Sequence, residues 1–223
     1  IPPPPPPTPP AAAKDYNDST WNTVSAPHDF LANGTFLSTN KETDGFLQRN
    51  VSWYRKHFTV PAEWKGASIW FRANAIFHVA TVYVNGQLVA DHPQGYVQFQ
   101  ARLDNLTTGA LSYGGGDNVI SIFVDATQTS SWWYAGGGLF NHVELVAVDP
   151  LHVAWDGVSS YSHVTGIAAD GRSASHATVG GWVEFQNDAS TSTTASAAYT
   201  LADASGFVVS SGPLPATLVL GNT

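Results

Sequence analysis

The stretch that decides the fold is Val79-Ala-Thr-Val-Tyr-Val84, followed by Asn85-Gly86 and then Gln87-Leu-Val-Ala90. Its first run is rich in β-branched and aromatic residues, which favour a strand. An Asn-Gly pair accepts the positive φ angles of a type I′ turn, the tight turn that matches the twist of two paired strands. The stretch therefore predicts an antiparallel β-hairpin.

Strand-like runs recur on both sides of this hairpin and are separated by turn signals. They span residues 51–60, 67–72, 119–124 and 143–148. Only 12% of the residues are charged, so few segments can carry the polar face of an amphipathic helix. These features predict an all-β fold.

Asp149-Pro150 interrupts the pattern, because proline cannot donate to a strand ladder and restricts the residue before it. Further short runs follow at residues 153–155, 179–185, 197–201 and 207–209, at spacings typical of an immunoglobulin-like β-sandwich. A complete sandwich of that type has about seven strands. We therefore expect a sandwich in residues 15–149, and in residues 150–223 an immunoglobulin-like domain that is truncated.

The chain begins with a proline-rich segment, residues 1–14. Proline fixes φ and lacks a backbone N–H, so the segment is expected to be an exposed, disordered tail that joins no sheet. A spacer is the preferred role, and a ligand for SH3 or WW-type domains is the alternative. The sequence also lacks Met, including at position 1, and we expect it to be a piece of a longer protein.

Composition argues against several classes of partner. The net charge is −8, with nine Lys and Arg residues, which predicts no nucleic-acid binding. No run approaches the roughly 18 apolar residues that span a bilayer, so no membrane partner is expected. Cysteine is absent, and the eight His residues show no paired ligand spacing, so neither a metal nor another cofactor is predicted.

Four Asn-x-Ser/Thr sequons provide candidate sites for N-glycosylation if the protein is secreted. They lie at Asn17, Asn33, Asn50 and Asn105. About two such sequons are expected by chance in this composition, so they give weak support for an extracellular location.

Six ordered blocks carry a resemblance to a known family. They are Trp21-x-x-Val24-x-x-Pro27-His28-Asp29-Phe30, Trp53-Tyr54-Arg55-Lys56-x-Phe58, Val82-Tyr83-Val84-Asn85-Gly86, Gly95-Tyr96-x-x-Phe99, Asn118-Val119-Ile120 leading to Val124-Asp125, and Trp133-Tyr134-x-Gly136-x-Gly138-Leu139-Phe140. Together they resemble the sugar-binding, jelly-roll domain that begins family 2 glycoside hydrolases of the β-galactosidase and β-glucuronidase type. The resemblance implies a galactose-binding-like jelly roll, then an immunoglobulin-like domain.

In that family a (β/α)₈ barrel comes third and carries two catalytic Glu residues of a retaining mechanism. The four Glu residues of this chain lie at positions 42, 63, 144 and 184, and none follows Asn, whereas the family's acid/base does. No catalytic residue is therefore assigned to this chain. The barrel would be an intramolecular partner in a full-length protein, and a β-linked carbohydrate the substrate.

The resemblance also implies that a loop, residues 131–141, extends toward the substrate. It makes Trp132, Trp133, Tyr134 and Asp29 candidate substrate-binding residues. Trp132 replaces an Asp or Arg that contacts sugar in several family members, and Asn141 replaces a usual Arg. An indole stacks on a sugar face rather than binding hydroxyls through charge.

Structural roles compete with these assignments. Aromatic packing beneath the loop remains open for Trp132 and is preferred for Trp133. For Asp29, together with His28, bracing a turn is preferred over ligand contact.

Three functions are consistent with these observations. The first is the non-catalytic front portion of a family 2 glycoside hydrolase. The second is a stand-alone carbohydrate-binding module without hydrolase activity, which would bind sugar at Trp132 and the loop of Gly136–Gly138. The third is a structural scaffold whose aromatic residues all lie in the core.

Overall fold

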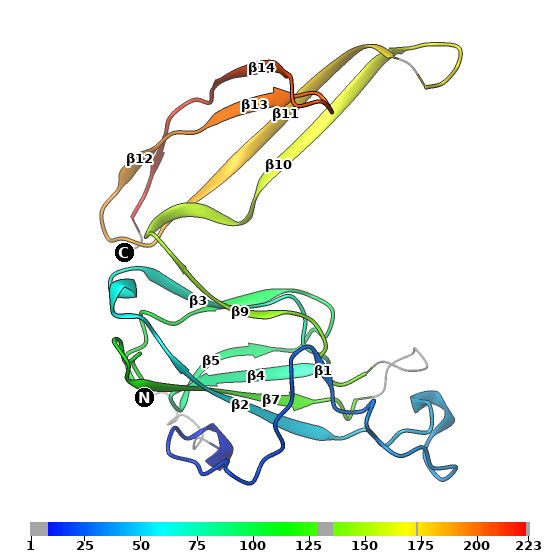
Figure 1. Ribbon diagram of the computed structural model, residues 1–223, viewed down its shortest axis with the longest axis vertical. Coiled ribbons are helices and arrows are strands. Elements are labelled where there is room, and N and C mark those ends of the chain that lie inside the picture. Colours follow the sequence, from blue (N-terminus) through cyan, green and yellow to red (C-terminus); the bar gives the residue numbers. More distant parts are fainter. Residues whose placement is uncertain (1–8, 129–135, 173, 222–223) are drawn as a thin grey trace, which may run out of the picture. The chain divides into compact units, whose positions relative to one another are not determined.

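The computed structural model describes residues 9–128, 136–172 and 174–221 and is built almost entirely of strands, which confirms the all-β prediction (Figure 1). The chain divides into two compact units between Ala147 and Val148. Helical structure within the described residues is limited to three single turns of 3₁₀ helix. They are η1 (Pro10–Ala12), η2 (Glu42–Asp44) and η3 (Ala62–Trp64).

The first unit contains two antiparallel sheets and a short ladder. The larger sheet has the order β2-β7-β4-β5, and the smaller has the order β6-β3-β9. The strands are β2 (Val51–Thr59), β3 (Ser68–Ala73), β4 (Val79–Val84), β5 (Gln87–His92), β6 (Phe99–Arg102), β7 (Asp117–Asp125) and β9 (Val143–Val148). β1 (His28–Asp29) pairs with β8 (Gly138–Leu139) in the separate ladder.

The hydrophobic core lies between the two sheets. Alternate residues of each strand point inward, as the period of two along a strand requires. From β3 these are Ile69, Phe71 and Ala73, which form one buried cluster with inward residues of β4 and β7 such as Val82 and Ile122. Burying each large aliphatic or aromatic side chain stabilises the fold by about 1.5–3 kcal/mol. The first unit is thus a β-sandwich.

The predicted hairpin is present as β4 and β5. Asn85 and Gly86 adopt φ angles of 48° and 86°, which confirms the Asn-Gly turn. The side chain of Asn85 also joins this turn to β7, because its Oδ1 accepts from the N–H of Val119 at 2.9 Å and its Nδ2 donates to Oδ1 of the buried Asn118 at 3.0 Å. The hairpin is therefore fixed to the centre of the larger sheet by side-chain hydrogen bonds as well as by strand pairing.

The described part of the proline-rich segment is ordered against the first unit, which corrects the prediction of a disordered tail through residue 14. Ala12 is 1% exposed. The guanidinium of Arg55, which is itself buried, donates to the carbonyl oxygens of Ala11 at 2.6 Å and Ala13 at 3.0 Å. Carbonyl groups accept hydrogen bonds whether or not their neighbours are prolines, so the lack of N–H donors does not prevent this packing.

In its described residues, the second unit contains three two-stranded antiparallel sheets. They pair β10 (Leu151–Ile167) with β11 (Ala174–Asn187), β12 (Thr193–Ala195) with β15 (Thr217–Val219), and β13 (Ala198–Ala202) with β14 (Val208–Pro213). The predicted run 153–155 is much shorter than β10, whose later part alternates serines with larger residues and carries a weak strand signal. The immunoglobulin-like assignment of this unit stays a prediction.

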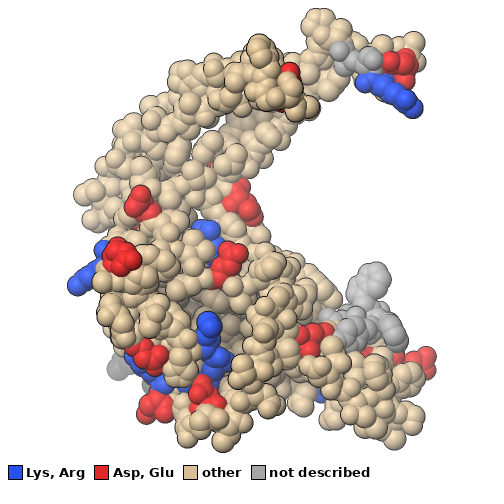
Figure 2. All heavy atoms as spheres, in the orientation of Figure 1, with Lys and Arg blue, Asp and Glu red and all other residues tan. Residues whose placement is uncertain are grey.

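The surface of the second unit is poor in charge and rich in exposed apolar side chains. Its 76 positions from Val148 include one Arg and no Lys. Figure 2 shows the corresponding scarcity of blue and red on the visible face. Tyr161 and Trp182 are each 59% exposed, and Phe207 is 71% exposed.

Candidate functional site at the base of the glycine loop

The predicted substrate loop includes the glycine run Gly136–Gly138, which leads into β8. The register of β8 against β1 places Asp29 opposite Gly138 and His28 opposite Leu139. The N–H of Phe30 donates to the carbonyl oxygen of Gly137 at 2.8 Å and extends this ladder. Two segments more than 100 residues apart thus form the base of the loop.

The carboxylate of Asp29 joins both segments. Its Oδ1 accepts hydrogen bonds from the backbone N–H groups of Leu31 at 2.9 Å, Ala32 at 3.3 Å and Gly137 at 3.1 Å. A carboxylate that accepts several backbone N–H groups forms strong, charge-assisted hydrogen bonds. Asp29 therefore braces the turn after β1 and holds the glycine run against it.

Gly138 lies at the most crowded point of this base. Its N–H donates to the carbonyl oxygen of Phe77 at 2.6 Å, and its carbonyl oxygen accepts from the N–H of Phe77 at 3.0 Å. A Cβ at this position would overlap the hydroxyl of Tyr54 and lie 2.7 Å from the carbonyl oxygen of His28, and the φ angle is +125°. Only glycine satisfies both the space and the backbone angle.

Tyr54 and His28 form a polar pair behind Gly138. The hydroxyl of Tyr54 lies 2.9 Å from Nδ1 of His28, and Nε2 of the same ring lies 3.4 Å from Nδ2 of Asn33. Burial raises the pKa of Tyr54 to about 12 because the phenolate is poorly solvated there. Tyr54 is accordingly a neutral hydrogen-bonding group at physiological pH.

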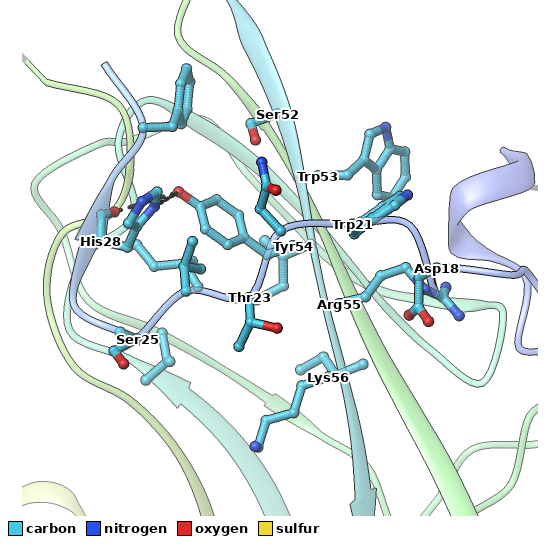
Figure 3. A pocket seen from close by; sticks show the side chains of 18 of the residues that line it. Asp18, Trp21, Thr23, Ser25, His28, Ser52, Trp53, Tyr54, Arg55 and Lys56 are labelled. Carbon is cyan, nitrogen blue, oxygen red and sulfur yellow. Dashed lines mark hydrogen bonds and ion pairs between the residues drawn. The ribbon is translucent and has the colours of Figure 1, made fainter. Parts of the chain in front are cut away.

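A cavity of about 1270 Å³ lies beside this base. One side is formed by residues 20–26, which we call the strap and all of which line the cavity. The other residues that line it come from β2, from β1 and β8, from β3, β7 and β9, and from the loop positions Asp18, Phe30 and Asn33. Figure 3 shows the strap passing in front of β2, with Thr23 and Ser25 on the strap and Ser52, Tyr54 and Lys56 on the strand.

The structure brings together some of the predicted site residues. Asp29 and its neighbour His28 lie at the base of the loop, in the contacts described above. Trp132, Trp133 and Tyr134 lie outside the described residues. Asn141, the second departure from the family pattern, uses its Oδ1 to accept from the N–H of His142 at 2.8 Å.

The four sequon residues Asn17, Asn33, Asn50 and Asn105 are all exposed. Asn33 is the one that belongs to the cavity lining. Whether any of them carries a glycan stays a prediction.

Sequence reasoning missed Tyr54 and Arg55 as anchors, although both stand in the Trp53-Tyr54-Arg55-Lys56 block. Alternation along β2 indicates that consecutive residues face opposite sides, but it does not identify the partner on either side. Tyr54 points to the glycine run, whereas Arg55 points to the N-terminal segment and to Oγ of Ser121, at 2.8 Å. The contacts of Tyr54 with His28 and of Arg55 with Ser121 span 26 and 66 residues along the chain.

The described residues contain no cluster of three or more His, Asp or Glu side chains that could hold a metal ion. Among the helices in the same part of the chain, none is long and apolar enough to cross a membrane.

Comparison with known proteins agrees with this architecture. A family model described as the second all-beta domain of beta-galactosidase matches residues 16–130. A β-galactosidase from Thermoanaerobacter pseudethanolicus is 32% identical over 147 residues, which are 62% of this chain and 19% of that protein. A β-glucuronidase from Formosa agariphila is 31% identical over 150 residues, which are 62% of this chain and 15% of that protein.

Solved structures extend the similarity to both units. A β-glycosidase from Bacteroides vulgatus superimposes with a TM-score of 0.75 at 27% identity, covering 91% of this chain and 25% of that one. A family 2 β-glucuronidase gives a TM-score of 0.77 at 25% identity, covering 96% of this chain and 24% of that one.

A β-sandwich followed by a second all-β unit is the front architecture of sugar-cleaving enzymes of this type. The chain belongs to glycoside hydrolase family 2, β-galactosidase type, and corresponds to a non-catalytic portion of such an enzyme. It spans less than a fifth of the length of the curated relatives that it matches.

Proposed function

We propose that this chain is the part of a β-glycosidase that carries the loop of residues 131–141 to the substrate-binding cleft of a catalytic barrel. The observation that carries the proposal is the rigid base of that loop. Asp29 and Phe77 are hydrogen-bonded to the glycine run 136–138, and the hydroxyl of Tyr54 lies against Gly138. A loop that contributes to a binding site must be positioned to a fraction of an ångström, and such positioning needs supporting contacts of this kind.

The relatives support a proposal for the substrate class. The names of the relatives include β-galactosidase, β-glucuronidase and β-glycosidase, which supports a β-linked glycoside as the substrate of the full-length protein. The loop has Trp132 where several family members have Asp or Arg. We propose that its indole stacks on the sugar ring, because aromatic rings bind the apolar face of a sugar without requiring a charged partner.

The test uses the protein encoded by the complete reading frame. It is assayed with chromogenic β-galactoside, β-glucuronide and β-mannoside, and Trp132→Ala is compared with wild type on the best substrate. We expect activity on at least one substrate and a reduction of kcat/KM of about 10-fold or more, the loss of one stacking contact being worth about 1–3 kcal/mol. The matched control is Trp182→Ala, which removes an exposed indole from the second unit.

Two outcomes contradict the proposal. If the full-length protein hydrolyses none of the three glycosides while the chain alone binds sugar, the stand-alone carbohydrate-binding module is favoured instead. If Trp132→Ala and Trp182→Ala have equal effects on kcat/KM, the loop makes no specific contribution to substrate binding.

A further inference from the structure

The sequence contains two Asn-Gly pairs, Asn33-Gly34 and Asn85-Gly86. In such a pair the backbone nitrogen of the glycine can attack the side-chain carbonyl carbon of the asparagine, because glycine has no side chain to block the approach. The structure places the two pairs in different surroundings. Asn85 lies in the turn of the β4–β5 hairpin, whereas Asn33 lies in the turn that follows β1.

The side chain of Asn85 is held at both ends of its amide group. Besides the contacts of Oδ1 with Val119 and of Nδ2 with Asn118, its Nδ2 donates to the carbonyl oxygens of Gly109 at 3.1 Å and Ala110 at 3.2 Å. Attack on Asn85 requires its carbonyl carbon to rotate toward the next backbone nitrogen, which would break these hydrogen bonds together. The fold therefore protects Asn85.

The side chain of Asn33 is held far less firmly. Among the described residues, its polar partner is Nε2 of His28, which lies 3.4 Å from Nδ2. The N–H of Gly34 donates to the carbonyl oxygen of Leu31 at 2.8 Å and closes a single turn, and residues 32–35 are all exposed. An exposed turn with few buried contacts opens at low cost, and opening frees the nitrogen of Gly34 for reaction.

We propose that Asn33 is a site of spontaneous deamidation. The backbone nitrogen of Gly34 gives up its proton to water and attacks Cγ of Asn33. The bond between Cγ and Nδ2 breaks, the amide nitrogen leaves as ammonia, and a cyclic succinimide remains. Water then adds to one of the two succinimide carbonyl carbons and opens the ring to aspartate or isoaspartate. This modification replaces a neutral amide by a carboxylate, and it does not depend on the glycosidase function proposed above.

The aspartate product reverses the hydrogen bonding of His28. With asparagine at position 33, the Nδ2 group donates to Nε2 of His28, so the ring proton is on Nδ1, which lies 2.9 Å from the hydroxyl oxygen of Tyr54 (Figure 3). A carboxylate can only accept, so Nε2 must then carry a proton. Because the hydroxyl of Tyr54 lies against Gly138, the modification changes the polar pair behind the glycine run.

Incubation of the 223-residue chain at mildly alkaline pH tests the site. The chain is produced without glycans, since a glycan on Nδ2 of Asn33 would block the reaction. Peptide mapping by mass spectrometry measures the conversion of each asparagine and separates aspartate from isoaspartate. We expect Asn33 to convert at least about 10-fold faster than Asn85, because opening of the held turn limits the reaction of Asn85. In urea, where both segments are unfolded, the ratio should fall to about 3-fold or less.

Asn105 is the internal control for exposure. It is exposed like Asn33 but is followed by Leu106, whose side chain hinders the attacking nitrogen. We expect its conversion to be slower than that of Asn33 by about 10-fold or more, as the steric difference between glycine and a branched side chain requires.

Asn33→Asp reproduces the aspartate product and tests its effect on His28. The ¹⁵N chemical shifts of the imidazole ring distinguish a nitrogen that carries a proton from one that accepts a hydrogen bond. At mildly alkaline pH we expect Nε2 of His28 to accept in wild type and to carry the proton in Asn33→Asp. The matched control is Asn105→Asp, which adds the same charge at an exposed position outside the cavity lining and should leave the ring shifts of His28 unchanged.

Three results would overturn the proposal. Equal conversion rates of Asn33 and Asn85 in the folded chain, or conversion of Asn33 no faster than that of Asn105, would contradict deamidation at Asn33. Identical ring shifts of His28 in wild type and Asn33→Asp would contradict the effect of the modification on the Tyr54–His28 pair.

Discussion

Oδ1 of Asp29 lies 3.1 Å from the backbone nitrogen of Gly137, which is 108 residues further along the chain. The same oxygen accepts from the N–H groups of Leu31 and Ala32, so one carboxylate binds both its own turn and the glycine run. This contact and the backbone hydrogen bond from Phe30 to Gly137 join the N-terminal motif Pro-His-Asp-Phe to the glycine run.

Replacing Asp29 tests that link. Asp29→Ala removes three accepted hydrogen bonds and leaves the N–H of Gly137 without its side-chain acceptor, so we expect a loss of about 1–3 kcal/mol in the free energy of unfolding. Asp29→Asn retains an oxygen acceptor without the charge, and its loss is expected to be smaller. Denaturant unfolding of the chain measures both. Asp15→Ala, at an exposed position, serves as control, and an equal loss in the control would contradict the role of Asp29.

Gly138→Ala tests the crowding at the base of the loop. The new methyl group would overlap the Tyr54 hydroxyl and a backbone carbonyl while φ remains at +125°. We expect destabilisation by more than about 2 kcal/mol, combining backbone strain with overpacking. Gly115→Ala provides the comparison, because Gly115 has φ +102° and a Cβ added there would meet no atom within 4 Å beyond its chain neighbours. Equal losses of folding stability in the two variants would mean that crowding at Gly138 contributes nothing to the destabilisation.

Arg55 holds the N-terminal segment to the outer face of the larger sheet. Arg55→Met keeps most of the apolar stem and removes every hydrogen bond that the Arg55 guanidinium donates to residues 11–18. We expect a loss of about 2–4 kcal/mol, since buried carbonyl groups lose a charged donor. Hydrogen exchange of the amides of Ala12, Ala13 and Tyr16, which donate within this segment, should accelerate. Unchanged exchange would contradict the anchoring role, and the exposed Arg172→Met is the control.

The Asp18–Arg55 pair predicts a specific dependence on pH. The hydrogen bond from Arg55 is the main reason that the pKa of Asp18 is lowered in the folded protein, since it favours the ionised form. A group whose pKa is lower in the folded state stabilises the fold above its unfolded pKa, about 3.9, and this contribution disappears as pH falls through the folded pKa. The side chain is 24% exposed, so the effect is reduced by solvent screening.

Unfolding of wild type and Asp18→Asn, measured between pH 6 and pH 2, tests this dependence. We expect wild type to be the more stable protein at pH 6 and the difference to shrink as the carboxylate of Asp18 becomes protonated. A difference that is constant over the whole range would show that the charge of Asp18 plays no part.

Residue patterns alone were sufficient to predict the positions of most strands of the first unit. In β4 and β5, the alternation of Val82 and Val84 with polar neighbours and the positive φ preference of Asn85-Gly86 are local properties, and local properties can be read in order along the chain. The preference for a structural role of Asp29 came from the same kind of reasoning, since short carboxylate side chains readily accept from the backbone two or three residues ahead.

Only the tertiary structure identified the contacts that join distant segments. The sequence predicts an exposed tail for residues 1–14, whereas the docking of Ala11 and Ala13 depends on a guanidinium more than 40 residues away. Likewise, residues 20–26 and β2 line one cavity, and neither segment by itself predicts that the two meet. Local propensity fixes where strands form, whereas the choice of partner depends on which chain segments meet when the core closes.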